Sequence, residues 1–354
     1  MVCGATEKAW AVGYTAIDWN PSGFTGSLAL GISGNQQVGW GYGSATGNQE
    51  HALLWNGSAA SYVDLNPNGF AWSSARGISG NQQVGHGSGS ATGNQEHALL
   101  WSSSAASYVD LNPGGFTRSY ALGISGSQQV GYGQIGNQSY ALLWSGSAES
   151  YVNLNPSGFT EALAYGISGN QQVGWGHGSA TGNMSHALLW NGSAASYVDL
   201  NPGGFSDSYA YGISGNQQIG WGYGSATGGN AHALLWSGSA ASYVDLNPGG
   251  FTVSVAQGIS GNQQVGVGWG SATGNKSHAL LWSGSAASYV DLHQFLPTGF
   301  VSSGALDIDS YGNIAGYAYD SSGTEHAIVW IIPEPATVAL LAIGGGLAAL
   351  RRRK

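Results

Sequence analysis

Six histidines that recur at a regular spacing are the residues with the clearest potential for chemistry. They open a recurring HAL or HAI segment and stand at His51, His97, His186, His232, His278 and His326. The corresponding residue of the third copy is Tyr140. A zinc site needs all of its ligands about 2 Å from one ion, whereas these histidines are a whole repeat apart. We therefore predict no metal site and no cofactor.

Each repeated histidine is better explained as a structural residue. A partly buried imidazole needs a hydrogen-bond partner, and the repeat offers backbone groups and one aspartate. These aspartates are Asp64, Asp110, Asp199, Asp245 and Asp291. The replacement by Tyr140 suits a hydrogen bond and does not suit a required metal ligand. We interpret the six histidines as residues that hold the repeat together.

A second set of candidates lies where the copies differ, in the segment that follows each QQ. Its variable members are Trp40, Tyr42, His86, Tyr132, Trp175, His177, Trp221, Tyr223 and Trp269. In a strand, Trp40 and Tyr42 share one face, and Gly39 and Gly41 share the other. Large rings at such positions can pack between repeats. A core position seldom tolerates Trp, His, Tyr and Val in turn, so a ligand surface that stacks on sugar rings is the alternative.

A catalytic centre finds little support in the sequence. There is no GxSxG motif, and Ser, His and Asp are abundant only because the repeat contains them. The near-identical copies offer no asymmetric pair of carboxylates for glycoside cleavage. The segment 307–313, DIDSYGN, looks like a calcium loop, but Tyr311 occupies a ligand position and no glutamate follows at the right distance. We predict a turn there and no catalytic residues.

Composition excludes nucleic-acid binding and a framework of disulfide bonds. The 354 residues include only 7% charged residues, and the formal net charge is −9. Four of the eight Lys and Arg residues are the last four of the chain, so the remainder are too scattered to bind nucleic acid. The single Cys3 excludes an internal disulfide framework.

The elements that must position these residues follow from the repeat. The tripeptide GIS recurs at Gly31, Gly77, Gly123, Gly166, Gly212 and Gly258, with a divergent copy at Asp307. Most copies are 46 residues apart. Each unit contains four short segments, SYVDL, ARGIS, QQVGWG and HALLW or close variants, separated by turn residues. This pattern predicts an all-β fold, a β-propeller of about seven four-stranded blades over residues 1–330.

The predicted units each end at a tryptophan, near residues 55, 101, 144, 190, 236, 282 and 330. Closure into a ring covers the end faces that an open array would expose. A partial repeat at Glu7–Trp10 would complete the last blade or belong to an eighth blade. A β-solenoid is the alternative fold, although its coils are usually much shorter.

The repeat resembles a known type of bacterial extracellular repeat. The pattern AxGISxxQQVG, HALLW and VDLNP is similar to HAF repeats over residues 15–330. HAL or HAI replaces HAF, but the Gly, His and Trp fall at matching places. This resemblance implies an exported protein and implies no established activity.

The chain ends in a segment of different composition, residues 331–354. Its motif is Pro333, Glu334 and Pro335. An apolar run follows at residues 336–350, and the last residues are Arg351, Arg352, Arg353 and Lys354. This order of features resembles a PEP-CTERM sorting signal, which implies cleavage by an exosortase-type membrane protease. In family naming, the same tail is sometimes labelled an ice-binding-protein C-terminal region.

We predict one short C-terminal transmembrane helix in the apolar run. Its length falls short of the roughly 20 residues that span a membrane comfortably, and three successive glycines weaken it. The final cations would stay on the cytoplasmic side of the inner membrane. The rest of the chain would be exported, tethered to that membrane and released to the cell surface by cleavage. A permanent anchor is the alternative.

The sequence therefore predicts an exported, non-enzymatic repeat protein of the cell surface or extracellular matrix, linked to exopolysaccharide or biofilm. The residues after Met1 include no apolar signal segment, so we expect the true start to lie upstream. A lectin-like propeller that binds extracellular polysaccharide is the main alternative, and a polysaccharide-active enzyme is the weaker one. An ice-binding role lacks support because the repeat has no short threonine ladder.

Overall fold

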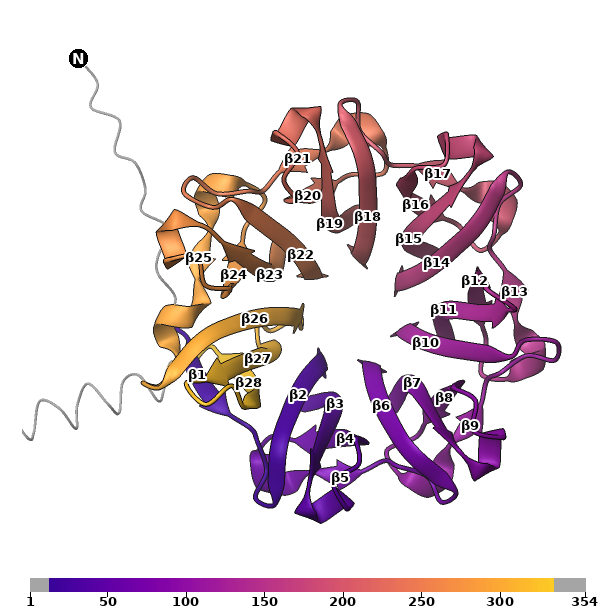
Figure 1. The fold of residues 1–354 in the computed structure, drawn as a ribbon, viewed down its shortest axis with the longest axis vertical. Helices are drawn as coiled ribbons and strands as arrows, with labels where there is room; N and C mark the ends of the chain where they lie inside the picture. The colour runs from indigo at the N-terminus through magenta and orange to yellow at the C-terminus, as the bar shows by residue number, and fades with distance from the viewer. Residues whose placement is uncertain (1–12, 334–354) are drawn as a thin grey trace, which may run out of the picture.

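A computed structural model describes residues 13–333, in which seven four-stranded antiparallel sheets surround a central axis (Figure 1). The prediction of an all-β propeller with seven blades is confirmed. The strands form because their segments alternate apolar and polar residues and are rich in β-branched and aromatic side chains. Gly and Asn residues supply many of the turns between strands, as at Gly34 and Asn35 between β2 and β3.

Each blade has an inner, a second, a third and an outer strand, counted from the axis (Figure 1). The inner strands are β2 (Phe24–Ser33), β6 (Phe70–Ser79), β10 (Arg118–Ser125), β14 (Phe159–Ser168), β18 (Phe205–Ser214), β22 (Val253–Ser260) and β26 (Phe300–Ile308). The second strands are β3 (Gln36–Gly43), β7 (Gln82–Gly89), β11 (Gln128–Ile135), β15 (Gln171–Gly178), β19 (Gln217–Gly224), β23 (Gln263–Trp269) and β27 (Ile314–Asp320).

The two outer layers of each blade are shorter. The third strands are β4 (His51–Asn56), β8 (His97–Trp101), β12 (Gln138–Trp144), β16 (Ser185–Trp190), β20 (His232–Trp236), β24 (His278–Trp282) and β28 (Glu325–Ile331). The outer strands are β5 (Val63–Asp64), β9 (Val109–Asp110), β13 (Val152–Asn153), β17 (Val198–Asp199), β21 (Val244–Asp245), β25 (Val290–Asp291) and β1 (Thr15–Asp18).

Short 3-10 turns connect the strands. Those after the second strands are η1 (Ser44–Thr46), η3 (Ser90–Thr92), η6 (Ser179–Thr181), η8 (Ser225–Thr227) and η10 (Ser271–Thr273). Those before the outer strands are η2 (Ala59–Ser61), η4 (Ala105–Ser107), η5 (Ala148–Ser150), η7 (Ala194–Ser196), η9 (Ala240–Ser242) and η11 (Ala286–Ser288). The longer linker after β25 forms η12 (Leu292–Phe295).

Strand β1 closes the ring because it pairs with β28 and becomes the outer strand of the last blade (Figure 1). The partial repeat Glu7–Trp10, which the sequence offered as a closing piece, lies outside the described residues. Each blade also begins and ends one strand later in the sequence than the predicted unit. SYVDL was placed at the start of a unit, but its Val-Asp pair forms the outer strand beside the preceding HALLW, as in β4 and β5.

The hydrophobic core is divided among the seven blade interfaces, and each interface holds one tryptophan. Trp101 of the second blade packs with Val38 and Leu54 of the first blade. At the closing interface, Trp55 of the first blade packs with Val329 of the last. The seven tryptophans have no exposed surface and are Trp55, Trp101, Trp144, Trp190, Trp236, Trp282 and Trp330.

Neighbouring blades lie close together at the glycine of GIS. A Cβ on Gly123 would lie 2.6 Å from the carbonyl oxygen of Tyr165 in the next blade, which is too close. The last blade carries Asp307 at this position. Its Oδ2 accepts the N–H of Ile32 in the first blade at 2.9 Å, and its Oδ1 accepts the N–H of Ile308 at 2.9 Å. A carboxylate therefore bridges the closing interface near the axis.

No helix within residues 13–333 is long and apolar enough to cross a membrane. The predicted transmembrane helix at residues 336–350 lies outside the described residues, as do Glu334, Pro335 and the basic cluster at residues 351–354. Pro333 is the last residue that the structure describes.

The Asp307 bridge should make the stability of the protein depend on pH. Burial raises the pKa of the Asp307 carboxyl from 3.8 to about 7, although its two backbone hydrogen bonds oppose the rise. The folded state thus binds the extra proton between these values, and this contribution to the free energy of unfolding is lost as pH rises through about 7. Asp307→Asn should flatten the slope. Urea unfolding of both proteins from pH 4.5 to 7.5 measures the difference, and equal slopes would contradict the shift.

Candidate functional site

Each repeated histidine lies within hydrogen-bonding distance of an aspartate on the neighbouring outer strand. The Nδ1 to Oδ2 distance is 2.7 Å for five pairs and 2.8 Å for His278 with Asp291. The other pairs are His51–Asp64, His97–Asp110, His186–Asp199, His232–Asp245 and His326–Asp18. Across residues 13–333, no three His, Cys, Asp or Glu side chains gather where they could hold a metal ion.

The histidine–aspartate pair belongs to a network that joins two blades. In the first blade, Asp64 Oδ1 accepts the N–H of Asn66 at 2.8 Å. Ser73 of the next blade donates to Asn66 Oδ1 at 2.7 Å and accepts the N–H of Ala52 at 3.1 Å. The pair therefore fixes the chain where it crosses from one blade to the next.

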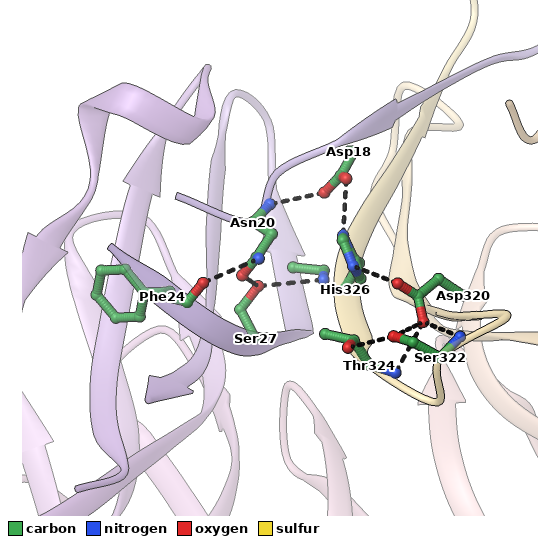
Figure 2. A network of polar contacts seen from close by, with 9 residues as sticks. Asp18, Asn20, Phe24, Ser27, Asp320, Ser322, Thr324 and His326 are labelled. Atoms are coloured by element: carbon green, nitrogen blue, oxygen red, sulfur yellow. Dashed lines mark hydrogen bonds and ion pairs between the residues drawn. The ribbon is translucent and has the colours of Figure 1, made fainter. Parts of the chain in front are cut away.

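The same network closes the ring, and it joins residues from the two ends of the described chain (Figure 2). His326 of the last blade contacts Asp18 at 2.7 Å, and Ser27 of the first blade donates to Asn20 at 2.7 Å. His326 also has a second carboxylate, Asp320, 3.8 Å from its Nε2. Asp18 could not be recognised as the partner of His326 from local sequence spacing, because the two residues lie 308 positions apart.

The network between the third and fourth blades has changed at three positions together. Tyr140 replaces the histidine and donates to Gln138 at 2.8 Å, Asn153 replaces the aspartate, and Ala162 replaces the serine. Asn153 still accepts the N–H of Asn155 at 2.8 Å. Joint replacement is what a set of mutually dependent hydrogen bonds would show, and it favours a structural role for the network.

The side chain of Asp309 stabilises the turn at residues 307–313. Asp309 Oδ1 accepts the N–H groups of Tyr311 at 2.8 Å and Asn313 at 2.9 Å. Asp307, in contrast, points its carboxylate at the closing interface. The two carboxylates are therefore both bonded to backbone N–H groups.

A double-mutant cycle on His186 and Asp199 should measure the energy of one pair. We expect His186→Ala and Asp199→Ala each to lower the free energy of unfolding by about 1–2 kcal/mol, because each removes the hydrogen bond between the imidazole and the carboxylate. The double variant should lose less than the sum, with a coupling of about 0.5–1.5 kcal/mol. Tyr140→Ala with Asn153→Ala, where no such pair forms, is the matched control. Additive effects at both sites would exclude a stabilising pair.

The variable aromatic residues divide into two groups, and the first group packs around the inner strands. His86 is buried and lies edge-on to Tyr120 of the next blade, with 5.0 Å between ring centroids. Tyr132 stacks on Tyr120 at 4.5 Å. Burial lowers the pKa of His86 to about 3, so this imidazole is neutral at ordinary pH.

The same arrangement recurs in the fifth blade. Trp221 stacks on Tyr209 with 4.4 Å between centroids and donates its indole N–H to Tyr211 at 3.1 Å. Trp175 of the fourth blade lies edge-on to the same Tyr209 at 5.4 Å. Trp40 is half-buried and stacks with Tyr42 at 6.2 Å. Because these rings pack against neighbouring side chains, substituting them would disturb the packing as well as any ligand-binding surface.

The second group lies nearer the solvent. Tyr42 is 37% exposed and Trp269 is 36% exposed. His177 and Tyr223 occupy the same place in their blades and are half-buried. His177 Nδ1 lies 3.2 Å from the hydroxyl of Thr160. These rings lie at the C-terminal ends of the second strands. They are the part of the predicted ligand surface that a sugar could reach.

A set of residues that the sequence analysis did not select lines a cavity on the propeller axis. It contains one residue from each inner strand: Leu30, Arg76, Leu122, Tyr165, Tyr211, Gln257 and Leu306. The cavity has a volume of about 340 Å³. Each of these residues sits at a β-bulge, where the register with the second strand shifts, as between Ala75 and Gly77. A bulge re-aims its side chain, and here all seven turn toward the axis.

The signal for this ring was present in the sequence. The residue directly before GIS differs between copies while its neighbours Ala and Gly are constant. This position belongs to a longer variable stretch between GF and GIS, but the sequence pattern of a strand does not reveal a bulge. We call the cavity lined by these seven residues the central channel, and only the structure reveals it.

Residues 332–354 match the model of the PEP-CTERM protein-sorting motif. The chain thus carries a C-terminal signal that indicates export, anchoring at a membrane and sorting by an exosortase. No curated protein matches the sequence.

Several solved structures share the propeller fold at low sequence identity. A puromycin hydrolase aligns with TM-score 0.59 and 10% identity over 87% of this chain and 52% of the hydrolase. A Mycobacterium tuberculosis puromycin-hydrolyzing peptidase gives 0.57 and 9%, over 86% of this chain and 50% of the peptidase. The β-propeller domain of the Trilobed protease from Pyrococcus furiosus gives 0.56 and 8%, over 88% of this chain and all of that domain. This chain spans about half the length of the first two proteins, and the likeness concerns the fold alone.

Proposed function

We propose that this protein is a non-enzymatic component of the cell surface or extracellular matrix, associated with exopolysaccharide. The observation that carries the proposal is the PEP-CTERM motif at residues 332–354, which indicates an exported protein sorted by an exosortase. The similarity of the repeat to HAF repeats supports the same location. An exosortase-type protease is the partner that the motif requires.

The non-enzymatic role is supported by how the repeated polar residues are used. The histidines and aspartates that recur in the blades are bonded to each other and to the chain crossings between blades. The buried His86 is held in a neutral state among aromatic rings. The peptidases with a similar propeller share its fold at about 10% identity, which carries no activity over to this chain.

The proposed processing places the mature protein outside the inner membrane. The exosortase would recognise Pro333, Glu334 and Pro335 and cut near them, while the apolar run still holds the chain in the membrane. The four final cations would remain with the fragment on the cytoplasmic side. The propeller would then be free to join the matrix.

Mass spectrometry of surface material from the native host tests this processing. We expect the mature protein to lack residues 351–354, and we expect a host without its exosortase to retain the full chain in the membrane. Glu334→Ala with Pro335→Ala should reduce cleavage at least tenfold, whereas Glu149→Ala, at an exposed turn, should not affect it. An intact tail on surface material would contradict cleavage and would favour the permanent anchor.

A lectin-like function is the second candidate, and the exposed rings of Tyr42 and Trp269 favour it. Aromatic faces of this kind stack on the apolar faces of sugar rings, and repeated shallow sites would give avidity for a polymer. The half-buried His177 and Tyr223 would complete such sites in other blades.

Glycan-array binding distinguishes the two candidates. If the propeller is a lectin, Tyr42→Ala with Trp269→Ala should weaken binding at least tenfold, because both rings would stack on the sugar. Tyr311→Ala is the matched control, since this ring is 74% exposed at the turn between β26 and β27, at the opposite end of the strands. Binding that survives loss of both rings would exclude this surface, and silence across a broad array would leave the matrix role.

A further inference from the structure

The central channel breaks the symmetry of the repeat at one charged residue. Among the seven side chains that line it, Arg76 alone carries a charge, and its neighbours in the ring are Leu30 and Leu122. All three sit at the same β-bulge of their blades. Because two adjacent blades fold with leucine at this position, the fold itself does not require an arginine there.

The guanidinium of Arg76 is poorly compensated within the protein. Its Nε is buried and has no hydrogen-bond partner. Within residues 13–333 no carboxylate lies within 4.0 Å of Arg76, whereas Arg118 on the periphery has Glu96 at 3.5 Å. The charge of Glu50 acts on Arg76 from beyond that distance and raises the pKa of the guanidinium, whereas burial lowers it. A largely buried cation without a close partner is costly, so its presence calls for a ligand.

Two tyrosines add hydrogen-bond donors to the same cavity. Tyr165 and Tyr211 line it from adjacent blades, with 5.0 Å between their ring centroids. Tyr211 accepts the indole N–H of Trp221, which leaves its own hydroxyl hydrogen to donate. Burial raises the pKa of both phenols, so both stay protonated at neutral pH. The side-chain amide of Gln257 follows in the next blade.

The acids near the channel are either engaged or set back from it. Asp307 borders the cavity, but its two oxygens accept the N–H groups of Ile32 and Ile308. Glu161 lies nearer the start of the same strand, β14, and does not line the cavity, although its charge raises the pKa of Tyr165. The free groups of the channel are therefore mainly donors, which suits a ligand that offers oxygen acceptors.

We propose that the central channel binds a uronic acid, a sugar that carries a carboxylate, with that carboxylate on Arg76. A guanidinium can hold both carboxylate oxygens at once, which a single hydroxyl cannot match. Tyr165, Tyr211 and Gln257 would bond the sugar hydroxyls, and the leucines would cover its apolar face. The volume of about 340 Å³ is within the range of small-ligand pockets. The choice of a sugar rests on the proposed link with exopolysaccharide, whereas the carboxylate rests on Arg76.

Calorimetric titration of the purified full-length protein in detergent with D-glucuronate tests the proposal. We expect glucuronate to bind, D-glucose to bind at least tenfold more weakly, and acetate to compete only at much higher concentration. Arg76→Leu, which installs the residue of the adjacent blades, should lower the affinity for glucuronate at least tenfold. Arg76→Lys should lose part of it, because it keeps the charge and loses the planar fork. Arg118→Leu, at the paired arginine, should leave it unchanged.

Thermal unfolding of the same variants separates binding from folding. We expect Arg76→Leu to melt at the same temperature as the parent or above it, because an uncompensated charge has been removed. Absence of glucuronate binding by the parent protein would overturn the proposal, as would equal affinity for glucose. Acetate binding as tight as glucuronate binding would overturn the sugar part. These measurements use purified protein, so their failure would leave the proposed export and matrix role intact, and a failure of sorting would leave them unaffected.

Discussion

The burial of one tryptophan at every blade interface is the interaction on which the ring depends. One buried tryptophan side chain removes about 150–250 Å² of surface from water. At about 25 cal/mol per Å², this corresponds to roughly 4–6 kcal/mol for each interface. A single four-stranded blade has no partner for this surface, so each blade is stable only between two others. The seventh interface must therefore form from opposite ends of the described chain. Strand β1 and the Asp18–His326 contact complete the last blade for this interface, and Asp307 bridges the last blade to the first near the axis.

The repeated polar residues serve the same end as the tryptophans. The histidine–aspartate networks hold the crossing between blades, where the chain leaves an outer strand and enters the next inner strand. The third network shows their interdependence, because Tyr140, Asn153 and Ala162 replace three of its members together. Residues that are constant in the repeat are thus used for assembly. The histidine that recurs in nearly every unit is accordingly bonded to an aspartate of its own blade, and the described residues hold no cluster of ligands for a metal ion.

The differences between blades are concentrated at two places in the fold. The outward ends of the second strands carry exposed rings such as Tyr42 and Trp269, and the bulges of the inner strands carry the channel residues. The two places are linked through packed rings, since Trp221 bonds to Tyr211 in the channel and stacks with Tyr223 near the surface. A propeller is suited to this division, because a constant scaffold can present seven independent side chains at one axis. The fold that it shares with peptidase propellers carries no activity over to this chain.

The sequence by itself determined the repeat length, the four strands of each blade, the turns between them and the sorting motif, since all of these depend on neighbouring residues. It also limited the partner of each repeated histidine to a backbone group or the aspartate 13 residues later, and the structure shows that the partner is the aspartate in five pairs. Tertiary structure decided that the ring closes at seven blades, that residues 15–18 close it, and that His326 pairs with Asp18. It also decided which aromatic rings are packed and which are exposed. The channel residues were hidden for a related reason: a bulge shifts the pairing between strands, so alternation along the sequence cannot show that Arg76 and its counterparts turn toward the axis.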